Sequence, residues 1–564
     1  MKNKLLEVEG LTVEFPTKSG PKTVVKNMSF QLDAGDRLGI VGESGSGKSM
    51  TALALMGLLP NLGKICSGSI KYNGIELLTL PEHELRLIRG NEISMIFQEP
   101  MTSLNPVFNI GNQIIEALRI HRALDEKQAI NKTVELLEAV QIPNAANRMN
   151  DYPHQLSGGQ RQRVMIAMAL ACEPAILIAD EPTTALDVTV QAEIFALLNE
   201  LGERFNTALI LITHDMGVVS QMVRKMLVMY GGEKVEEGGV ADVISNPSHP
   251  YTRGLIACVP HISADPNKRL SRLPEIKGEN HEFTPGVVVN SKKEEKSVEK
   301  TIPALVVKNL SVSYQTRQKD EDGGYKIFNA VKDVSFNIER GKSLGIVGES
   351  GAGKTSVALA IARLIQRSSG EIKLAGQDFG QLDEKEVRHA RRGIQFIFQD
   401  PYSSLNPRLR ASDIVREPMQ YAGNITRPEQ EEMIDELFNA VGLLPEQKGL
   451  FPHQFSGGQR QRIGIARALA TRPSLIICDE PVSALDVAVQ AQTLNLLKSL
   501  QEKFKLTYLF ISHDLGVIYH MCDEVMVMYM GEVMEHQNSN SFFSCPSHPY
   551  SRALLDAVPQ INAQ

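Results

Sequence analysis

Residues 42–49 of this chain read Gly-Glu-Ser-Gly-Ser-Gly-Lys-Ser, and residues 348–355 read Gly-Glu-Ser-Gly-Ala-Gly-Lys-Thr. Each stretch follows an apolar run typical of a strand and precedes a run typical of a helix. A glycine-rich turn in that place lets backbone N–H groups surround phosphate oxygens, and the helix N-terminus favours the anion. We therefore predict two phosphate-binding loops, made of Gly42, Glu43, Ser44, Gly45, Ser46, Gly47, Lys48 and Ser49, and of Gly348, Glu349, Ser350, Gly351, Ala352, Gly353, Lys354 and Thr355.

Two residue types in each loop have a more specific predicted role. The lysine at the helix start, Lys48 or Lys354, suits a bridge between the β- and γ-phosphates of a nucleotide. The hydroxyl residue after it, Ser49 or Thr355, suits Mg²⁺. The bland alternative is an ordinary glycine-rich turn, and the repetition of the pattern after a strand in both places argues against it.

The loops belong to a unit that is written twice. Residues 6–15 match residues 305–314 at an offset of 299, and the same offset relates Ser157 to Ser456 and Tyr251 to Tyr550. The offset stays at 299 from Ser157 to Tyr251, and a fixed offset over roughly a hundred residues indicates duplication of a whole domain rather than a solenoid of short repeats. We predict domains at 1–263 and 302–564, joined by a flexible, solvated tether at 264–301 that is rich in charge and broken by proline.

Each copy alternates short β-rich runs with helical patterns, which indicates an α/β fold with a mixed, mainly parallel sheet. Between Gln98 and Ser157 the pattern changes. Ile130, Val134 and Leu137 follow helical spacing, and Ile434, Leu437 and Val441 repeat this in the second copy. We therefore predict an inserted helical subdomain in each domain.

An apolar strand ends in two carboxylates in each copy, Asp180 and Glu181 in the first and Asp479 and Glu480 in the second. Such an ending is often no more than an exposed strand edge. Beside a phosphate loop, however, the first carboxylate suits the Mg²⁺ shell and the second suits polarising a water that attacks the γ-phosphate.

A third pair of motifs opens two further helices: Ser157, Gly158, Gly159 and Gln160, and Ser456, Gly457, Gly458 and Gln459. The simple reading is a capping box, in which serine and glutamine satisfy free N–H groups at the helix start. The adjacent glycines favour a second reading, because they leave backbone N–H groups bare for an anion.

Composition excludes several classes of protein. The chain has 564 residues with 59 basic and 66 acidic side chains, a formal charge of −7 and a pI near 6.1, which argues against a protein held to nucleic acid by bulk charge. Its six cysteines form no C-x-x-C pair, which indicates a reducing compartment. The apolar runs are far shorter than the ~20 residues of a membrane helix, so we expect membrane contact only through partners.

The order of these motifs resembles the nucleotide-binding domains of ATP-binding cassette proteins, over nearly all of both copies. The resemblance implies P-loop NTPase domains that bind ATP and Mg²⁺ and form an intramolecular pseudo-dimer. In it, Ser157 and its glycines close over nucleotide held by Lys354, and Ser456 closes over nucleotide held by Lys48. The resemblance also assigns Gln98 and Gln399 to Mg²⁺ contact and partner sensing, His214 and His513 to the γ-phosphate, and Phe15 and Tyr314 to stacking on adenine. A histidine after a strand is often structural and an aromatic at a strand end is often core, so those readings stay open.

Narrower features resemble ATPase subunits of bacterial dipeptide and oligopeptide importers, the fused glutathione-import type above all. They are the runs 97–106 and 398–407 and the tails Pro247–Arg253 and Pro546–Arg552. This implies an ATPase on the cytoplasmic face of the inner membrane that energises import of short peptides. Its implied partners are two permease subunits and an extracytoplasmic solute-binding protein. No cysteine cluster follows Pro260 or Pro559, so we expect no iron–sulfur cluster. The alternative is a soluble tandem ATPase acting on the ribosome, which would need a long, basic, helical linker.

Overall fold

The computed structural model describes residues 4–17, 20–184, 186–260, 269–271, 275–277, 282–284, 302–319, 325–400, 402–421 and 425–559. The chain divides into two compact units, which consist mainly of Met1–Ala257 and of Gly286–Val558. Each unit therefore corresponds to one copy of the sequence repeat. The first unit also includes Leu273–Pro285, and the second also includes Cys258–Arg272.

The first unit contains a six-stranded sheet and a smaller antiparallel sheet. The strands of the large sheet are parallel apart from β10, which pairs antiparallel with β9. Their order is β10 (Glu233–Gly239), β9 (Lys225–Tyr230), β3 (Arg37–Val41), β8 (Ala208–Ile212), β7 (Ile176–Asp180) and β6 (Ile93–Ile96). The small sheet has the order β2 (Gly20–Asp33), β1 (Lys4–Thr17), β4 (Lys64–Tyr72) and β5 (Ile75–Glu76). Strands β7 and β8 are buried along their whole length, as expected for parallel strands covered on both faces.

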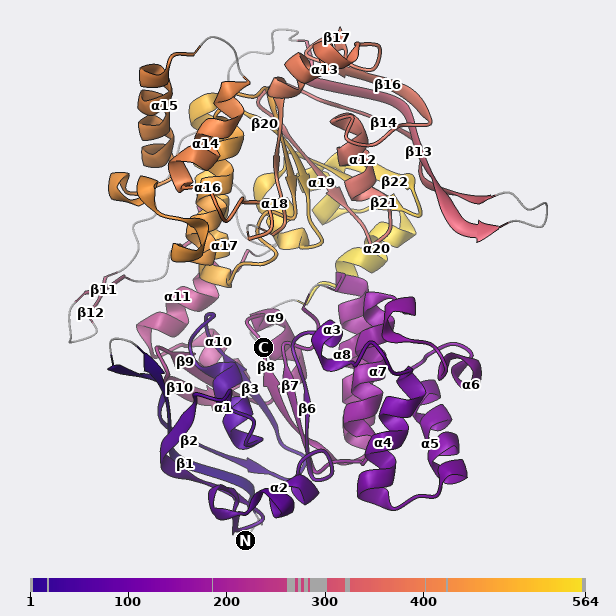
Figure 1. The fold of residues 1–564 in the computed structure, drawn as a ribbon, viewed down its shortest axis with the longest axis vertical. Coiled ribbons are helices and arrows are strands. Elements are labelled where there is room, and N and C mark those ends of the chain that lie inside the picture. The colour runs from indigo at the N-terminus through magenta and orange to yellow at the C-terminus, as the bar shows by residue number, and fades with distance from the viewer. Residues whose placement is uncertain are drawn as a thin grey trace. The chain divides into compact units, whose positions relative to one another are not determined.

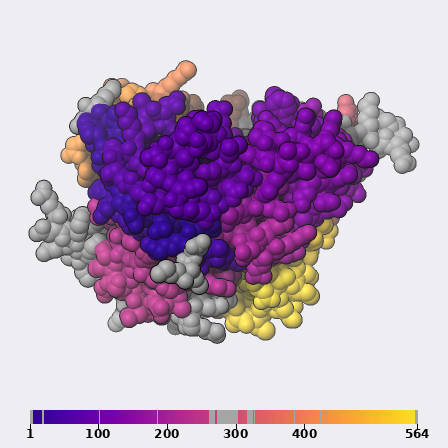
Figure 2. Space-filling view, turned by 90° about the horizontal axis from the view of Figure 1, so that it is seen from below, coloured from indigo at the N-terminus to yellow at the C-terminus, as the bar shows by residue number. Residues whose placement is uncertain are grey.

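Helices cover the sheets, and a group of them forms the inserted subdomain. Figure 1 shows α4, α5 and α6 together with α7, to one side of the strands of the first unit. The predicted insertion is therefore confirmed. The helices are α1 (Lys48–Leu55), α2 (Glu82–Ile88), α3 (Pro100–Ser103), α4 (Ile110–Arg122), α5 (Glu126–Ala139), α6 (Ala145–Arg148), α7 (Gly158–Leu170), α8 (Val188–Arg204), α9 (Met216–Met222), α10 (Val240–Ser245) and α11 (Pro250–Cys258). In Figure 2 the N-terminal residues, in indigo, and the inserted region, in purple, adjoin on the surface of this unit.

The second unit repeats this architecture. Its large sheet runs β18 (Ile394–Ile397), β19 (Leu475–Asp479), β20 (Thr507–Ile511), β15 (Ser343–Val347), β21 (Glu524–Tyr529) and β22 (Glu532–Asn538), and its small sheet runs β14 (Tyr325–Ile338), β13 (Leu305–Lys319), β16 (Ser369–Leu374) and β17 (Gln377–Asp378). Its helices are α12 (Lys354–Ile361), α13 (Glu384–Ala390), α14 (Ala411–Gln420), α15 (Arg427–Ala440), α16 (Gly457–Leu469), α17 (Val487–Phe504), α18 (Leu515–Met521), α19 (Ser539–Ser544) and α20 (Pro549–Asp556). The predicted α/β class is confirmed in both copies.

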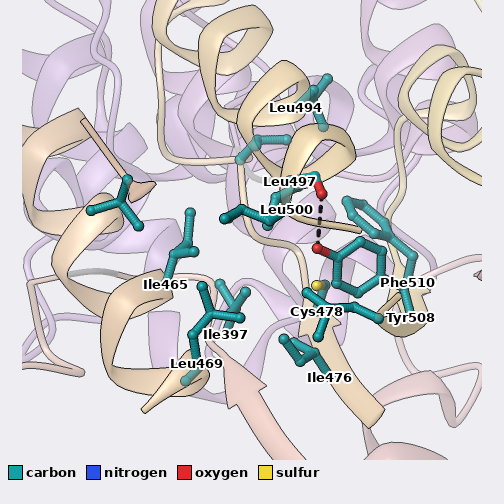
Figure 3. Packing of buried hydrophobic residues seen from close by; sticks show 14 of the residues in the cluster. Ile397, Ile465, Leu469, Ile476, Cys478, Leu494, Leu497, Leu500, Tyr508 and Phe510 are labelled. Atoms are coloured by element: carbon teal, nitrogen blue, oxygen red, sulfur yellow. Dashed lines mark hydrogen bonds between the residues drawn. The ribbon is translucent and has the colours of Figure 1, made fainter. Parts of the chain in front are cut away.

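The core of the second unit shows how the sheet is held. Figure 3 shows Ile476 and Cys478 of β19 and Tyr508 and Phe510 of β20 packed among leucines and isoleucines of α16 and α17. The fully buried Tyr508 hydroxyl donates a hydrogen bond of 2.9 Å to the backbone oxygen of Leu497. A buried tyrosine needs such a partner, because an unpaired hydroxyl in an apolar core is costly. The packing fixes β19, which ends at the predicted carboxylates.

Part of the predicted tether is held rather than solvated. The Arg269 guanidinium donates to the backbone oxygen of Asn495 (3.0 Å) and to the Glu502 carboxylate (2.8 Å), and its side chain is only 13% exposed. Leu270 exchanges two hydrogen bonds with the Asn495 side chain, at 3.1 and 2.8 Å. At these residues α17 supplies polar partners to the stretch 264–301. Most of that stretch lies outside the described residues, so its flexibility stays a prediction. Two short strands, β11 (Glu275–Lys277) and β12 (Glu282–Thr284), pair antiparallel further along the same stretch.

Candidate functional site

The first phosphate loop lies between β3 and α1, as the sequence predicts. Its shape depends on glycine, since Gly45 and Gly47 have φ angles of 80° and 99°, in the left-handed region. A Cβ atom on Gly47 would lie 2.5 Å from the backbone oxygen of Val24. Gly47 is also the residue before α1, so the loop ends at a helix N-terminus whose N–H groups are exposed to an anion.

Lys48 is buried, at 6% exposure, and its ammonium group lies over the loop itself. Its Nζ donates to the backbone oxygens of Gly42 (2.7 Å) and Glu43 (2.8 Å). Lys354 does the same in the second loop, with distances of 2.7 Å to Gly348 and 2.9 Å to Glu349. Carbonyl oxygens of the loop thus accept hydrogen bonds from each lysine ammonium group. Each lysine would in turn help its loop to bind phosphate.

An unpaired hydroxyl tests whether the first loop suits an anion. The Ser46 side chain is only 4% exposed, and among the residues that the structure describes its hydroxyl oxygen has no hydrogen-bond partner. A buried hydroxyl without a partner is unfavourable, and a phosphate oxygen would supply one. Together with the glycine turn and the buried lysine, this donor fits a nucleotide phosphate. The second loop has Ala352 at this position and lacks the hydroxyl.

The two carboxylates lie beside the loop because parallel strands place their carboxyl ends at one edge of the sheet. The Ser49 hydroxyl donates to Asp180 (3.1 Å), which joins the two residues predicted to hold Mg²⁺. In the second unit the Thr355 hydroxyl lies 3.4 Å from Asp479. An oxygen pair of this kind suits a magnesium shell completed by water and phosphate oxygens.

Glu181 contacts two other predicted site residues, Gln98 and His214. Its carboxylate accepts a hydrogen bond from the Gln98 amide (2.8 Å) and lies 3.1 Å from Nδ1 of His214. Its φ of 45° is rare for a residue other than glycine, asparagine or aspartate. Backbone strain of this kind is typical of functional sites, where the surrounding contacts hold the residue in place.

The charges of this group differ in their pKa values. The pKa of Asp180 is raised to about 6, by burial first and also by the neighbouring Glu181 carboxylate, against the hydrogen bond from Ser49. Burial would also raise the pKa of Glu181, but the hydrogen bond and the charge of His214 outweigh it and lower that pKa. The pKa of His214 is raised by Glu181 although burial alone would lower it. Glu181 is therefore kept ionised next to a carboxyl group that holds its proton more tightly.

The second unit repeats this geometry. Glu480 accepts from the Gln399 amide (2.7 Å) and lies 3.2 Å from His513, with a φ of 48°. The pKa of Asp479 is raised, by burial first, while that of Glu480 is lowered by His513 despite burial. Both copies thus have the same arrangement of loop lysine, carboxylate pair, glutamine and histidine.

The serine motif takes the capping-box form in both units. The Ser157 N–H donates to the Gln160 side chain (3.1 Å), and the Gln160 N–H donates to the Ser157 hydroxyl (3.3 Å). Ser456 and Gln459 make the same pair of bonds. The cap does not bury the motif, because Ser157 and Ser456 are both exposed. The capping reading and exposure to an anion are therefore compatible.

The two glycines after each serine have different roles. A Cβ atom on Gly159 would lie 2.8 Å from the Val190 side chain, and one on Gly458 would lie 2.4 Å from Val489. This glycine allows α7 to approach α8, and α16 to approach α17. A Cβ atom on Gly158 would meet only the Leu186 side chain, at 3.7 Å. Gly159 and Gly458 thus have a packing role as well. That the glycines of each motif expose backbone N–H groups to an anion stays a prediction.

The predicted adenine-stacking residues differ in exposure. Phe15 is partly buried against the first core, where a Cβ atom added at Gly63 would lie 2.7 Å from its ring. Tyr314 is 39% exposed, and its hydroxyl lies 3.2 Å from that of Ser356. Tyr314 thus presents a ring to solvent, whereas Phe15 serves the core as well.

Two site residues escaped the sequence reading. The Thr184 hydroxyl lies 3.1 Å from both the backbone oxygen and the carboxylate of Glu181. Tyr251, buried in α11, accepts a hydrogen bond of 3.1 Å from the N–H of Glu43. Thr184 lies three residues after Glu181 and could have been found from hydroxyl placement, whereas Tyr251 is far from the loop in sequence.

The described residues also bear on membrane spans and metal sites. Among the described helices, none combines the length and the apolar character that a membrane span requires. Within the described ranges, no group of three or more histidine, cysteine or acidic residues is placed to hold a metal ion by itself. A metal at the carboxylate pair would therefore need oxygen ligands from a bound nucleotide or water.

Comparison with known proteins agrees with this geometry. The family model described as ABC transporter matches residues 25–184 and 331–483. A second model, described as the C-terminal region of oligopeptide and dipeptide transporters, matches residues 235–286 and 534–564.

Similar curated proteins match nearly the whole of this chain. The glutathione import ATP-binding protein of Pectobacterium atrosepticum is 44% identical over 567 residues, which cover 99% of this chain and 90% of the relative. The protein of that name from Escherichia coli strain K12 is 45% identical over 561 residues, with 98% and 89% covered. Among solved structures, a dimeric ATP-binding cassette bound to ADP and Pi is 31% identical over 42% of this chain and 98% of its own, with a TM-score of 0.37.

Proposed function

The chain belongs to the ABC transporter family, and we propose that it is the ATP-hydrolysing subunit of an importer of short peptides, whether dipeptides, oligopeptides or glutathione. The observation that carries this proposal is the similarity over nearly the whole chain to glutathione import ATP-binding proteins. The match of both tails to the C-terminal region of oligopeptide and dipeptide transporters supports it independently. No comparison supports the alternative of an ATPase that acts on the ribosome.

The chain's own residues suggest how hydrolysis would proceed. The loop N–H groups and Lys48 would bind the phosphates of ATP, with Lys48 exchanging its contacts to Gly42 and Glu43 for phosphate oxygens. Ser49 and Asp180 would hold Mg²⁺, which neutralises phosphate charge when bound. Glu181 would orient the attacking water and accept its proton.

Gln98 and His214 would act through Glu181. Their contacts of 2.8 and 3.1 Å hold the carboxylate in one orientation, and the positive charge of His214 keeps it ionised. Gln98 lies in the segment that follows β6. A partner bound to this segment would shift Gln98 and so alter its contact with Glu181. Gln399 and His513 would have the same roles toward Glu480.

We further propose that the two domains, 1–263 and 302–564, form an intramolecular pseudo-dimer. In it, Ser456 would seal nucleotide held by Lys48, and Ser157 would seal nucleotide held by Lys354. The exposure of both serines supports this pairing. Phe15 and Tyr314 would stack on the two adenines.

The partners proposed are two membrane permeases and an extracytoplasmic solute-binding protein, with this subunit at the cytoplasmic face of the inner membrane. Exposed apolar residues that follow Gln98 and Gln399 support a permease contact. They are Val107 (71%) and Phe108 (53%) in the first unit and Tyr402 (62%) in the second. An iron–sulfur cluster is not part of the proposal.

The test is peptide uptake in a strain that lacks the gene. Labelled dipeptide, oligopeptide and glutathione uptake should be restored by the wild-type chain and not by Lys48→Ala/Lys354→Ala, with equal expression of both. If the deletion affects none of the three uptakes, while the purified chain sediments with ribosomes, the importer proposal is wrong.

A further inference from the structure

A buried tyrosine in the C-terminal part of the first unit reaches the phosphate loop. Tyr251 lies in the first turn of α11 and is only 1% exposed. Its hydroxyl oxygen accepts a hydrogen bond of 3.1 Å from the backbone N–H of Glu43. Its ring packs at 4.4 Å from that of Tyr230, at the end of β9. The hydrogen bond between Glu43 and Tyr251 joins residues that are 208 positions apart.

The start of α11 is fastened so that the ring is held in place. The Glu236 carboxylate of β10 accepts hydrogen bonds from the N–H (2.7 Å) and the hydroxyl (2.7 Å) of Ser248 and from the N–H of His249 (3.1 Å). A carboxylate that accepts several N–H groups ahead of a helix satisfies donors that would otherwise be unpaired. The second unit is built alike, with Glu535 in the same role and Tyr550 packed at 4.6 Å from Tyr529.

The hydrogen bond falls on a peptide group that Lys48 also contacts. The peptide that joins Gly42 to Glu43 has its oxygen bound by the Lys48 ammonium (2.7 Å) and its N–H bound by Tyr251 (3.1 Å). Both polar ends of this peptide plane are therefore fixed, from opposite directions. Gly42 has a φ of 154°, a conformation that few side chains tolerate, so the plane follows a glycine with unusual rotational freedom.

We propose that Tyr251 is a positioning residue for the first nucleotide site, which locks the Gly42–Glu43 peptide plane and so fixes the entry to the phosphate loop. Without the hydroxyl, the plane can rotate at Gly42 and turn its oxygen away from Lys48. The N–H of Glu43 would also lose this hydrogen bond, which is unfavourable. The ring alone would still fill its place against Tyr230. The importer-type tail thus acts on nucleotide binding through one hydroxyl group.

This inference rests on the proposed assignment of residues 42–49 as a nucleotide-binding loop. The full-length chain carrying Lys354→Ala has one intact loop, so binding of a fluorescent ATP analogue to it reports on the first site. If adding Lys48→Ala leaves that binding intact, the site assignment fails. If adding Lys48→Ala abolishes it, the effect of Tyr251 can be judged separately.

The deciding variant is Tyr251→Phe in the Lys354→Ala chain, and its matched control is Tyr72→Phe. Tyr72 is also buried, at 5% exposure, and its hydroxyl donates to Glu92 (2.8 Å) in the small sheet. Each change removes one hydroxyl from a buried tyrosine, but of the two only the Tyr251 hydroxyl is hydrogen-bonded to the loop.

We expect Tyr251→Phe to weaken analogue binding about three- to tenfold, the effect of losing one hydrogen bond of ordinary strength. Amide hydrogen exchange of the peptide that contains Glu43 should also become faster. Tyr72→Phe should change neither. Binding within twofold of the parent chain in Tyr251→Phe, or equal weakening in both variants, would overturn the proposal.

Discussion

Replacing Glu181 or Glu480 by glutamine, one at a time, tests the hypothesis that both copies hydrolyse ATP. Glutamine keeps the shape of the side chain and can still accept the amide hydrogen bond of Gln98 or Gln399. It carries no charge and cannot accept a proton from water. Because a positioned general base contributes about 10²- to 10⁴-fold, the substituted site should lose at least about 99% of its own turnover.

The consequence for the whole protein depends on how the sites are linked. If the two sites turn over independently, each single variant keeps about half of the wild-type rate, and if they must act together, it keeps much less. The double variant should retain on the order of 1% or less. We expect each single variant to lose at least about half, since the two carboxylates have the same neighbours at nearly the same distances.

The assay is phosphate release by the complete transporter in lipid vesicles, with saturating ATP and transported peptide. Glu233→Gln is the control, because this carboxylate is about half-exposed and pairs only with Lys26 at the surface. It should keep the full rate. A full rate in either Glu181→Gln or Glu480→Gln would refute the two-site hypothesis.

Three further outcomes follow from the first site. Burial raises the pKa of Asp180 to about 6, so the gain in nucleotide affinity on adding Mg²⁺ should increase from about pH 5 to about pH 7, and calorimetry should find no such trend in Asp180→Asn. The pKa of His214 is raised by Glu181 against the effect of burial, so the stability that this pair contributes is fully present below about pH 6.5 and is lost as pH rises through the raised value. The difference in melting temperature between wild type and His214→Gln should therefore shrink from about pH 6.5 to about pH 8.5 in scanning calorimetry. Gly47→Ala places a Cβ atom 2.5 Å from the backbone oxygen of Val24 at a φ of 99°, and it should abolish binding of the ATP analogue and destabilise the domain by about 1–3 kcal/mol in chemical unfolding.

The parts of the site that could be predicted are those that the local sequence specifies. The loop at residues 42–49 needs only a strand, glycines and a helix start, all of which lie within one short stretch. Asp180 and Glu181 end a buried strand, and parallel strands bring such ends to a common edge. The duplication then allowed each prediction to be checked against its twin, as at Asp479 and Glu480.

The parts that could not be predicted depend on contacts between distant residues. No sequence pattern indicates that the Tyr251 hydroxyl meets the N–H of Glu43. Gly159 reads as a source of bare N–H groups, and only the position of Val190 on a different helix reveals that it permits close packing. Arg269 lies in a charged, proline-rich stretch whose composition indicates solvent, and its partner Glu502 is supplied by α17.

The loop carbonyls that hold Lys48 have a consequence for which anions the site accepts. A single orthophosphate ion would have to separate the ammonium group from two short contacts, at 2.7 and 2.8 Å, and could offer little beyond its own charge in return. On the proposed assignment of this loop to nucleotide, a triphosphate chain would also engage the helix start and the hydroxyl of Ser46. The contacts of Lys48 would thus favour a triphosphate over orthophosphate. Free phosphate in the cell would then compete weakly with ATP, and the phosphate released by hydrolysis would leave the site.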